Sequence, residues 1–319
     1  MTMIRIWCKV GTICLAFITV SANAALYGRL PLTPGGTDFQ AYYEDELKTL
    51  WTADANLPAS KTFGVLDIIS GGRMHWSTAQ TWIAAMNSDG GTGYLGISNW
   101  RLPHMKKLLG DEDIPSVNCS AVAVDEDRCK DNEYGYLYYY DGVTNDGGTS
   151  AGPFDHLSNG YWSSTVARLD ASKAWQFRFN GGGQNALEKE GYNIHAWAVR
   201  DGDVRLPVSI DVLQGCINTD ARGVIPVAIL GAEDFDVTWV NQSSLSFSGF
   251  PVGMLGNGSP QCSHKYVNAD SYLDLVCQFR SVADAWEPDN GTATLLGSLL
   301  DGQAVPQPIE GSDSICIVP

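Results

Sequence analysis

The side chains that most often do chemistry are present in this sequence, but no known catalytic motif brings them together. Five histidines are scattered along the chain, and none lies in an HExxH or nucleophile-elbow context. Ser163 and Ser164 have no identifiable base beside them in the sequence, so we expect their hydroxyls to bond to nearby backbone groups. The sequence therefore predicts no catalytic residues.

The cysteines have the pattern of a disulfide framework. Two of the eight, Cys8 and Cys14, lie in the first 24 residues, and no pair of the other six forms a CxxC motif. We expect the neighbours Cys119 and Cys129 to pair. The last four cysteines allow three connectivities, of which we favour Cys262 with Cys277 and Cys216 with Cys316.

Aromatic side chains supply the candidate ligand-binding residues of the chain. Arg101 lies between Trp100 and Leu102 in the stretch NWRLP, where its guanidinium can pair with a carboxylate or bond to loop carbonyls. The alternative is that Trp100 and Arg101 line a ligand groove. We include Trp162 as a further candidate, because an exposed indole can be a platform for a sugar.

A tyrosine-rich run, YGYLYYYDG, is the most distinctive aromatic cluster. On an extended segment Tyr134, Tyr136, Tyr138 and Tyr140 would share one side, with Tyr139 on the other. One reading is a half-buried strand. The other exposes one face on a loop, where tyrosine can stack on sugars, and makes Tyr136, Tyr138 and Tyr140 candidate ligand residues.

Residues 1–24 read as a signal peptide that is not part of the fold. Arg5 and Lys9 precede a short apolar run, and Ala22-Asn23-Ala24 resembles a cleavage site. Of the 20 basic residues, 18 then face 36 acidic ones, a formal net charge of −18. This charge disfavours nucleic acid and anionic membranes as partners. We expect a secreted or periplasmic protein whose mature chain does not insert into a membrane.

The pattern of elements changes near residue 203 and predicts two domains. Before that point, residues 75–86 have a helical apolar stripe and a capping box of Ser77 with Gln80. A second helix is expected over 104–109, and strands over 160–167, 173–182 and 195–202. Trp175, Phe177 and Phe179 alternate with polar residues, as on a half-buried strand. Residues 25–49 are a lead-in that is either a short helix or an ordered segment.

The second domain, residues 204–319, reads as an all-β antiparallel sandwich. Its apolar runs are short, β-rich and separated by turn signals. The candidate strands are residues 208–213, 223–230, 244–249, 272–279, 293–300 and 314–318.

Residues 50–203 resemble the Lcl C-terminal domain family of bacteria. The resemblance rests on seven blocks in order: LWTADANL, RMHWSTAQTWIAAM, NWRLP, EYGYLYY, GYWSSTVA, AWQFRFNGG and HAWAVRDGD. It implies an α+β C-type-lectin-like fold, related in layout to the formylglycine-generating enzyme fold, and an exported binding role. In at least one member the ligands are sulfated glycans. Cysteine chemistry of the formylglycine-generating type is not expected, because no cysteine lies between Lys130 and Val212.

The second domain resembles a β-sandwich module found at the C-terminus of secreted bacterial proteins. Members of that group often carry an Asp-rich loop that suits Ca²⁺. Here the loop reads YVNADSYLDLV, which keeps Asn268, Asp270 and Asp274 but has tyrosines at two expected acidic positions. The resemblance thus implies at most a weak Ca²⁺ site, and no other cofactor is expected.

Together these features predict an exported, non-enzymatic module that binds a glycan or a cell-surface protein. Two alternatives stay open: a diverged enzyme, either of the formylglycine-generating fold or a hydrolase, and a structural spacer in a surface assembly.

Overall fold

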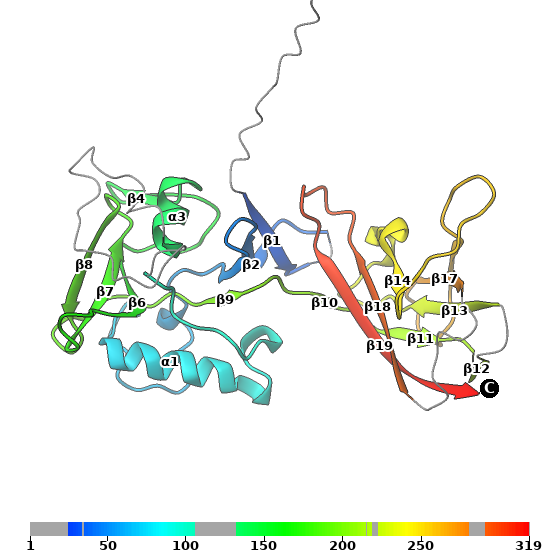
Figure 1. Ribbon diagram of the computed structural model, residues 1–319, viewed down its shortest axis with the longest axis horizontal. Coiled ribbons are helices and arrows are strands. Elements are labelled where there is room, and N and C mark those ends of the chain that lie inside the picture. The colour runs from blue at the N-terminus through cyan, green and yellow to red at the C-terminus, as the bar shows by residue number, and fades with distance from the viewer. Residues whose placement is uncertain are drawn as a thin grey trace, which may run out of the picture.

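The computed structural model describes residues 25–33, 35–105, 132–214, 216–218, 223–280 and 291–318. The chain forms two lobes joined by an extended segment that runs from β9 to β10 (Figure 1). The predicted signal peptide, the pair Cys119–Cys129 and residues 106–109 of the predicted second helix lie outside the described residues. His104 and Met105, the part of the predicted second helix that is described, are not helical.

A four-stranded antiparallel sheet in the order β1-β2-β3-β9 begins the first lobe. Its strands are β1 (Leu26–Pro31), β2 (Phe39–Glu44), β3 (Thr49–Thr52) and β9 (Val199–Asp201). Residues 25–49, which the sequence left open, therefore supply two whole strands, and the described part of this range contains no helix. Glu44 closes the turn after β2, because its carboxylate accepts the N–H groups of Glu46 at 3.0 Å and Leu47 at 2.5 Å.

A second antiparallel sheet is packed on both faces. It consists of β6 (Gly160–Val166), β7 (Lys173–Arg178) and β8 (Gly183–Glu188). Ala174 faces a core with α1 residues, whereas Trp175 and Phe177 face a core with α3 residues. The predicted half-buried strand is therefore covered on both sides. A small hairpin of β4 (Thr144–Asp146) and β5 (Thr149–Ala151) precedes β6 in the sequence.

Helix α1 (Trp76–Ser88) confirms the helix predicted from the apolar stripe. Ala79, Ile83 and Met86 are buried, as that stripe requires. The predicted capping box is wrong: His75 is the N-cap residue, and the Ser77 hydroxyl donates to Glu190 Oε2 at 3.0 Å instead. The helix ends where Gly90 takes a left-handed conformation with φ 57°.

Helix α3 (Glu133–Tyr139) replaces the extended tyrosine segment that the alternation predicted. Asn132 begins the helix, since its side-chain oxygen accepts the N–H of Gly135 at 2.9 Å. Tyr136 and Tyr140 are therefore neighbours one turn apart, and Tyr134 is fully buried.

Short 3₁₀ turns complete the helical structure of the described residues. They are η1 (Leu57–Ala59), η2 (Asp89–Gly91), η3 (Tyr94–Gly96), η4 (Val237–Trp239) and η5 (Gln242–Ser244).

The second lobe consists of two β-sheets that share one apolar core. One sheet has the order β11-β13-β17-β16, and the other β10-β19-β18-β14-β15, with β12 also paired to β19. Val227 and Leu275 of the first sheet share this core with Leu295 and Ile309 of the second. The bounds are β10 (Leu206–Pro207), β11 (Ile210–Val212), β12 (Cys216–Asn218), β13 (Val224–Ile229), β14 (Ser246–Phe247), β15 (Phe250–Pro251), β16 (Cys262–Lys265), β17 (Asp274–Arg280), β18 (Gly291–Ser298) and β19 (Pro308–Val318).

Each strand predicted in this domain overlaps a strand of the structure, but β10, β12, β15 and β16 were not predicted, and the pairing is not purely antiparallel. β10 and β12 both lie parallel to β19. The favoured disulfides, Cys216–Cys316 and Cys262–Cys277, are both present. Each joins residues that face each other on paired strands.

The two lobes are bound together at a seam with buried polar contacts. Gln307, which is 2% exposed, accepts the N–H of Leu30 at 2.9 Å and donates to the carbonyl of Val204 at 2.9 Å. Beside it, the buried Arg29 makes two hydrogen bonds to Asp203, at 2.7 and 2.9 Å. The link between the domains is thus fixed to β1 on one side and to the segment before β19 on the other.

Candidate functional site

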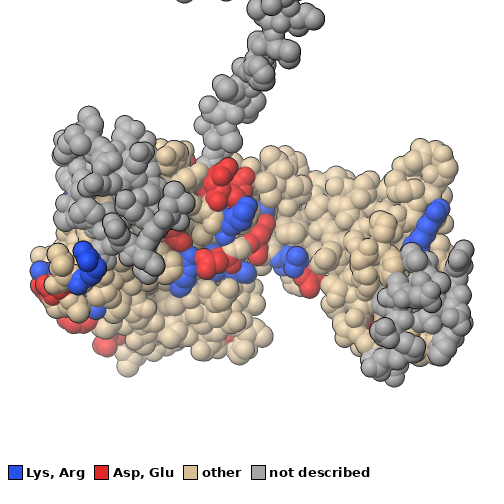
Figure 2. Space-filling view, viewed as in Figure 1, with Lys and Arg blue, Asp and Glu red and all other residues tan. Residues whose placement is uncertain are grey.

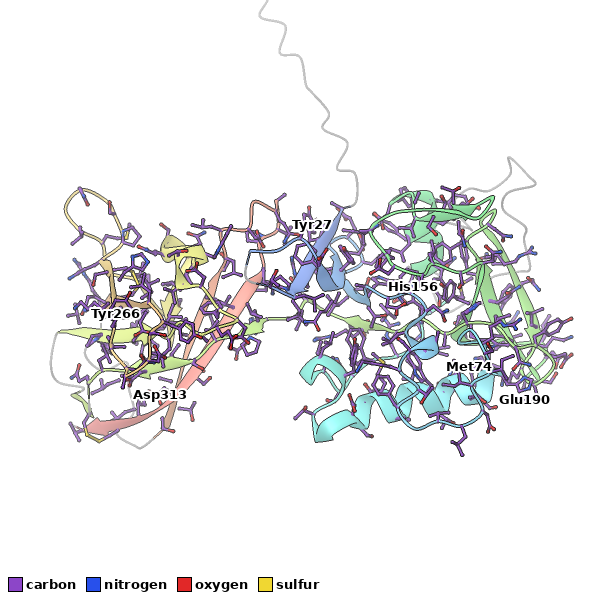
Figure 3. The ribbon with its side chains drawn as sticks, turned by 180° about the vertical axis from the view of Figure 1, so that it is seen from behind. Tyr27, Met74, His156, Glu190, Tyr266 and Asp313 are labelled. Carbon is purple, nitrogen blue, oxygen red and sulfur yellow. A yellow bond between two sulfur atoms is a disulfide. The ribbon has the colours of Figure 1, made fainter. Side chains whose placement is uncertain are left out.

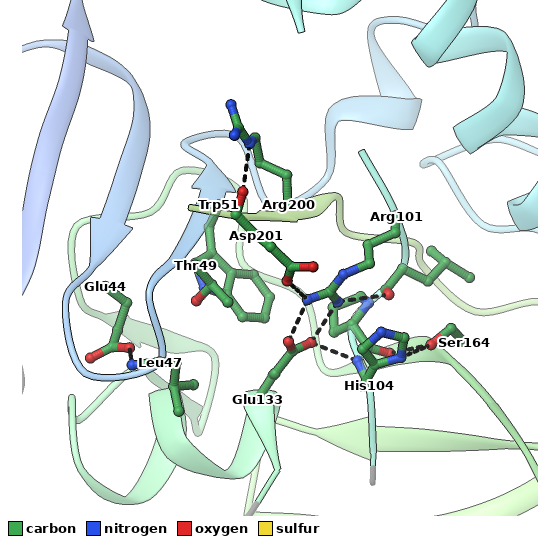
Figure 4. A network of polar contacts seen from close by, with 12 residues as sticks. Glu44, Leu47, Thr49, Trp51, Arg101, His104, Glu133, Ser164, Arg200 and Asp201 are labelled. Atoms are coloured by element: carbon green, nitrogen blue, oxygen red, sulfur yellow. Dashed lines mark hydrogen bonds and ion pairs between the residues drawn. The ribbon is translucent and has the colours of Figure 1, made fainter. Parts of the chain in front are cut away.

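The Trp-Arg-Leu-Pro stretch forms a corner that joins β9 to the start of α3. The backbone of Arg101 pairs with Val199 of β9, with N–H···O distances of 2.7 and 2.9 Å. Its side chain extends toward Glu133, the first residue of α3 (Figure 4).

The guanidinium of Arg101 is held by two carboxylates. Nη1 and Nη2 bond to the two oxygens of Glu133 at 2.8 and 2.6 Å, and Nη2 also bonds to Asp201. Burial alone would lower the pKa of Arg101, but the bonds and charges of Glu133 and Asp201 outweigh it and hold that pKa above its usual value. The bidentate carboxylate pair that the sequence suggested is confirmed. Both Nη groups of Arg101 are engaged within the fold, so they offer little to a ligand.

Next to this corner the structure places a histidine against a serine. The Oγ of Ser164 lies 2.6 Å from Nδ1 of His104 and 3.2 Å from the carbonyl of Pro103. The backbone N–H of His104 donates to Glu133 at 2.6 Å. The expected bonds of these serines to backbone carbonyls are confirmed, but the sequence did not show that His104 also lies beside Ser164. The neighbouring Ser163 is fully buried and bonds to the backbone carbonyl of Trp175.

The two tryptophans among the candidate ligand residues belong to the core. Trp100 is 2% exposed and its indole N–H donates to the carbonyl of Tyr94, while Trp162 is 0% exposed and donates to the carbonyl of Met74. Neither indole has a surface that a sugar can reach, because each packs in the apolar cluster that includes α1. These two residues are structural in the described fold.

The tyrosines of α3 divide into a buried and an accessible set. Tyr138 is partly buried against Phe177 and Phe179, with ring centroids 5.8 and 6.3 Å away. Tyr136 and Tyr140 stack on each other with centroids 4.6 Å apart and planes inclined by 29°. Tyr140 is 50% exposed, so this pair presents an aromatic surface to solvent.

Several carboxylates act on the phenol of Tyr136. The pKa of Tyr136 lies above its usual value, first because of burial and then because of the charges of Glu44, Glu46 and Asp141. Burial also raises the pKa of Asp141 to about 8 and that of Glu44 to about 7. The sequence analysis missed Glu44, Glu133 and Asp141, because the burial of Glu44 and Asp141 and the pairing of Glu133 with Arg101 arise only in the folded chain.

The predicted Ca²⁺ loop of the second lobe uses its oxygens internally. Asp274 is fully buried, and its carboxylate accepts the N–H groups of Gly231 at 3.0 Å and Val267 at 2.8 Å. Asn268 donates to Asp270 at 2.7 Å. Within the described residues, no group of three or more His, Cys, Asp or Glu side chains is arranged to hold a metal ion. A weak Ca²⁺ site stays a prediction that only a binding measurement can test.

The surface features of the two lobes differ in the views of Figures 2 and 3. Charged side chains gather on the first lobe and near the seam in the view of Figure 2, and the second lobe shows few. Tyr266, which follows β16 and is 66% exposed, lies on the second lobe far from α3 (Figure 3). Among the described residues, no helix has the length and apolar character to cross a bilayer.

Part of the chain matches a known protein family. The family model described as the Lcl C-terminal domain matches residues 42–200, which begin within β2 and end within β9. No curated protein matches the chain. The match thus starts inside the segment that the sequence left as a lead-in and covers α1, the Arg101 corner and α3. Residues 42–200 of this chain are an Lcl C-terminal domain.

Proposed function

We propose that this protein is an exported, non-enzymatic binding module, and that its ligand is a glycan bound on the tyrosine face of α3. The single observation that carries the proposal is the stacked pair of Tyr136 and Tyr140, with Tyr140 50% exposed. The proposed scaffold is C-type-lectin-like, with α1 and α3 on opposite faces of the β6-β7-β8 sheet.

The chemistry of the tyrosine face suits a sugar. A pyranose ring presents C–H groups that pack on an aromatic ring, and its hydroxyls bond to phenols and carboxylates. Here phenol rings and acidic side chains lie together, since the charges of Glu46 and Asp141 act on Tyr136. The acidic surroundings favour neutral or amino sugars over sulfated ones.

Export is supported by two independent features. The first 24 residues have the composition of a signal peptide. The second lobe carries two disulfides, which form and persist in oxidising compartments. We therefore propose a secreted or periplasmic location.

A glycan array followed by calorimetry on the mature protein tests the binding proposal. Tyr140→Ala should weaken binding of a glycan found on the array by about tenfold, equivalent to about 1.4 kcal/mol. Tyr192→Ala is a matched control, because Tyr192 is also 50% exposed but follows β8 rather than α3. Equal affinity of the two variants, or no binding to any polysaccharide, would refute the proposal.

The contact between Ser164 and His104 favours a second candidate, a hydrolase. A serine is activated as a nucleophile when an adjacent base takes its proton, and the 2.6 Å contact meets that distance. Hydrolysis of activated esters by the mature protein, abolished in Ser164→Ala and in His104→Gln, would establish it. Equal rates for the wild-type chain and Ser164→Ala would exclude this serine as the nucleophile.

A further inference from the structure

We infer that the buried carboxyl of Asp141 is a proton-controlled latch on the C-terminal turn of α3, and that the charge of Glu44 opposes its ionisation. The latch is closed while Asp141 carries its proton, and it opens when both carboxyls are ionised. The inference concerns a buried acid that the proposed glycan site does not use directly.

The position of Asp141 is the first part of the argument. It lies two residues beyond the end of α3, and its N–H bonds to the carbonyl of Tyr136 at 3.3 Å. Both of its carboxylate oxygens are buried, and neither accepts a hydrogen bond from a described residue. A buried carboxylate without partners is costly when charged, whereas its protonated form costs far less.

The charges that face Asp141 make ionisation harder still. Glu44 and Asp45 act on it from β2 and the turn that follows. From its own helix it faces the phenol of Tyr136, on which Glu46 and Tyr140 also act. The C-terminal end of a helix also carries partial negative charge, which disfavours a carboxylate.

No cation of the described residues compensates these acids by an ion pair. Lys48, in the same turn, bonds through Nζ to the backbone carbonyl of Asp45 at 3.4 Å and not to a carboxylate. Glu44 is 0% exposed, and its two oxygens are occupied by the N–H groups of Glu46 and Leu47. Glu44 therefore cannot turn away to avoid a charge on Asp141 without breaking its own turn.

The direction of the pH effect follows from these positions. Burial, then Glu44 and Asp45, raise the pKa of Asp141 from 3.8 to about 8. Because the folded-state pKa lies above the unfolded one, the closed state is most stable at low pH and loses stability as pH rises from about 4 to about 8. The rise in the pKa of Glu44, from 4.5 to about 7, acts in the same direction.

The structure also indicates which segment moves. Val143 is fully buried and its N–H bonds to the carbonyl of Leu137 at 2.9 Å, so it anchors the chain beyond the latch. Gly142 between them has φ 70° and open space around it. The turn of Tyr140 and Asp141 can therefore swing outward about Gly142 and separate Tyr140 from Tyr136. An effect on ligand affinity would rest on the proposed function, but the opening itself does not.

Hydrogen exchange on the mature chain tests the latch without any ligand. Amide protection of residues 136–143, corrected for the intrinsic exchange rate at each pH, should fall by about tenfold between about pH 6.5 and about pH 9. Protection in α1 should stay constant over this range. Asp141→Asn should abolish the change, while Asp170→Asn, at a partly exposed acid between β6 and β7, should preserve it.

Each result of the exchange experiment either supports or overturns the latch. A pH-dependent fall in residues 136–143 of the wild-type chain that Asp141→Asn removes would support the latch. If Asp141→Asn does not fold, Glu44→Gln gives a second test: the pH dependence should remain, because burial still raises the pKa of Asp141, but its midpoint should move downward, because one opposing charge is gone; an unmoved midpoint would overturn the latch. Equal pH dependence in α1 and α3, or in the wild-type chain and Asp141→Asn, would overturn it. A failure of glycan binding leaves this measurement unaffected.

Discussion

Replacing Arg101 with methionine should destabilise the first lobe more than any other single change at its corner. The substitution keeps much of the apolar stem but leaves Glu133, whose side chain is 8% exposed, without its bidentate partner. Removing one partner of a buried ion pair costs about 3 to 5 kcal/mol, and the 20% exposure of the Arg101 side chain puts the expectation at about 3 kcal/mol.

Asp201→Asn is the matched control for this prediction. Asp201 contacts the same guanidinium, but its side chain is 77% exposed, so the loss should be about 0 to 1 kcal/mol. The double variant Arg101→Met with Glu133→Gln should recover part of the loss, because no buried charge remains while the N–H of His104 keeps an acceptor.

Urea unfolding followed by tryptophan fluorescence measures these differences. Trp51, Trp82, Trp162 and Trp197 are fully buried in the first lobe, so their emission reports its unfolding. We expect a lower midpoint with an unchanged slope for Arg101→Met. The reasoning would be refuted if Arg101→Met and Asp201→Asn had the same midpoint, since the corner would then be held by packing alone.

Three further changes test other parts of the structure. Replacing both cysteines of the Cys216–Cys316 bridge by alanine should lower the free energy of unfolding by about 4.7 kcal/mol, and the same change at Cys262–Cys277 by about 3 kcal/mol. The difference arises because the bridges close loops with sequence separations of 100 and 15 residues. Calorimetry of the two double variants shows which loss is larger. Gln307→Ala should cost about 2 to 4 kcal/mol, because it leaves the N–H of Leu30 and the carbonyl of Val204 buried without partners, and limited proteolysis should then cut near residues 201–207. Ser77→Ala should change the melting temperature by less than about 2 °C, because the Ser77 hydroxyl bonds to an exposed Glu190 and caps no helix. A loss of stability of about 1 kcal/mol would instead support the capping box that the sequence predicted.

The sequence predicted those parts of the fold that depend on local pattern. The stripe of Ala79, Ile83 and Met86 requires a helix whatever it packs on, and α1 is there. Six strands of the second lobe are flanked by turn signals and were predicted for the same reason, whereas β10, β12, β15 and β16 were not predicted. The two described disulfides followed from spacing and from the need to close the domain.

The features that the sequence analysis missed depend on contacts between distant segments. Alternating tyrosines favour a strand, but Asn132 at the N-cap and the pairing of Glu133 with Arg101 select a helix for α3. The contact of Ser164 with His104 likewise brings together β6 and the Arg101 corner. The sequence cannot distinguish a core tryptophan from an exposed one that binds a sugar. Only the burial of Trp100 and Trp162 in the fold shows that both belong to the core.

The seam at Gln307 has a consequence for the molecule as a whole. A hinge between domains needs a stretch of chain whose backbone groups are free to exchange one set of partners for another. Here the carbonyl of Val204 and the N–H of Leu30 share one buried side chain, and Asp203 is clamped by Arg29. These contacts oppose independent rotation of the two lobes, so anything that fixes the second lobe in place also constrains the orientation of Tyr136 and Tyr140 on the first.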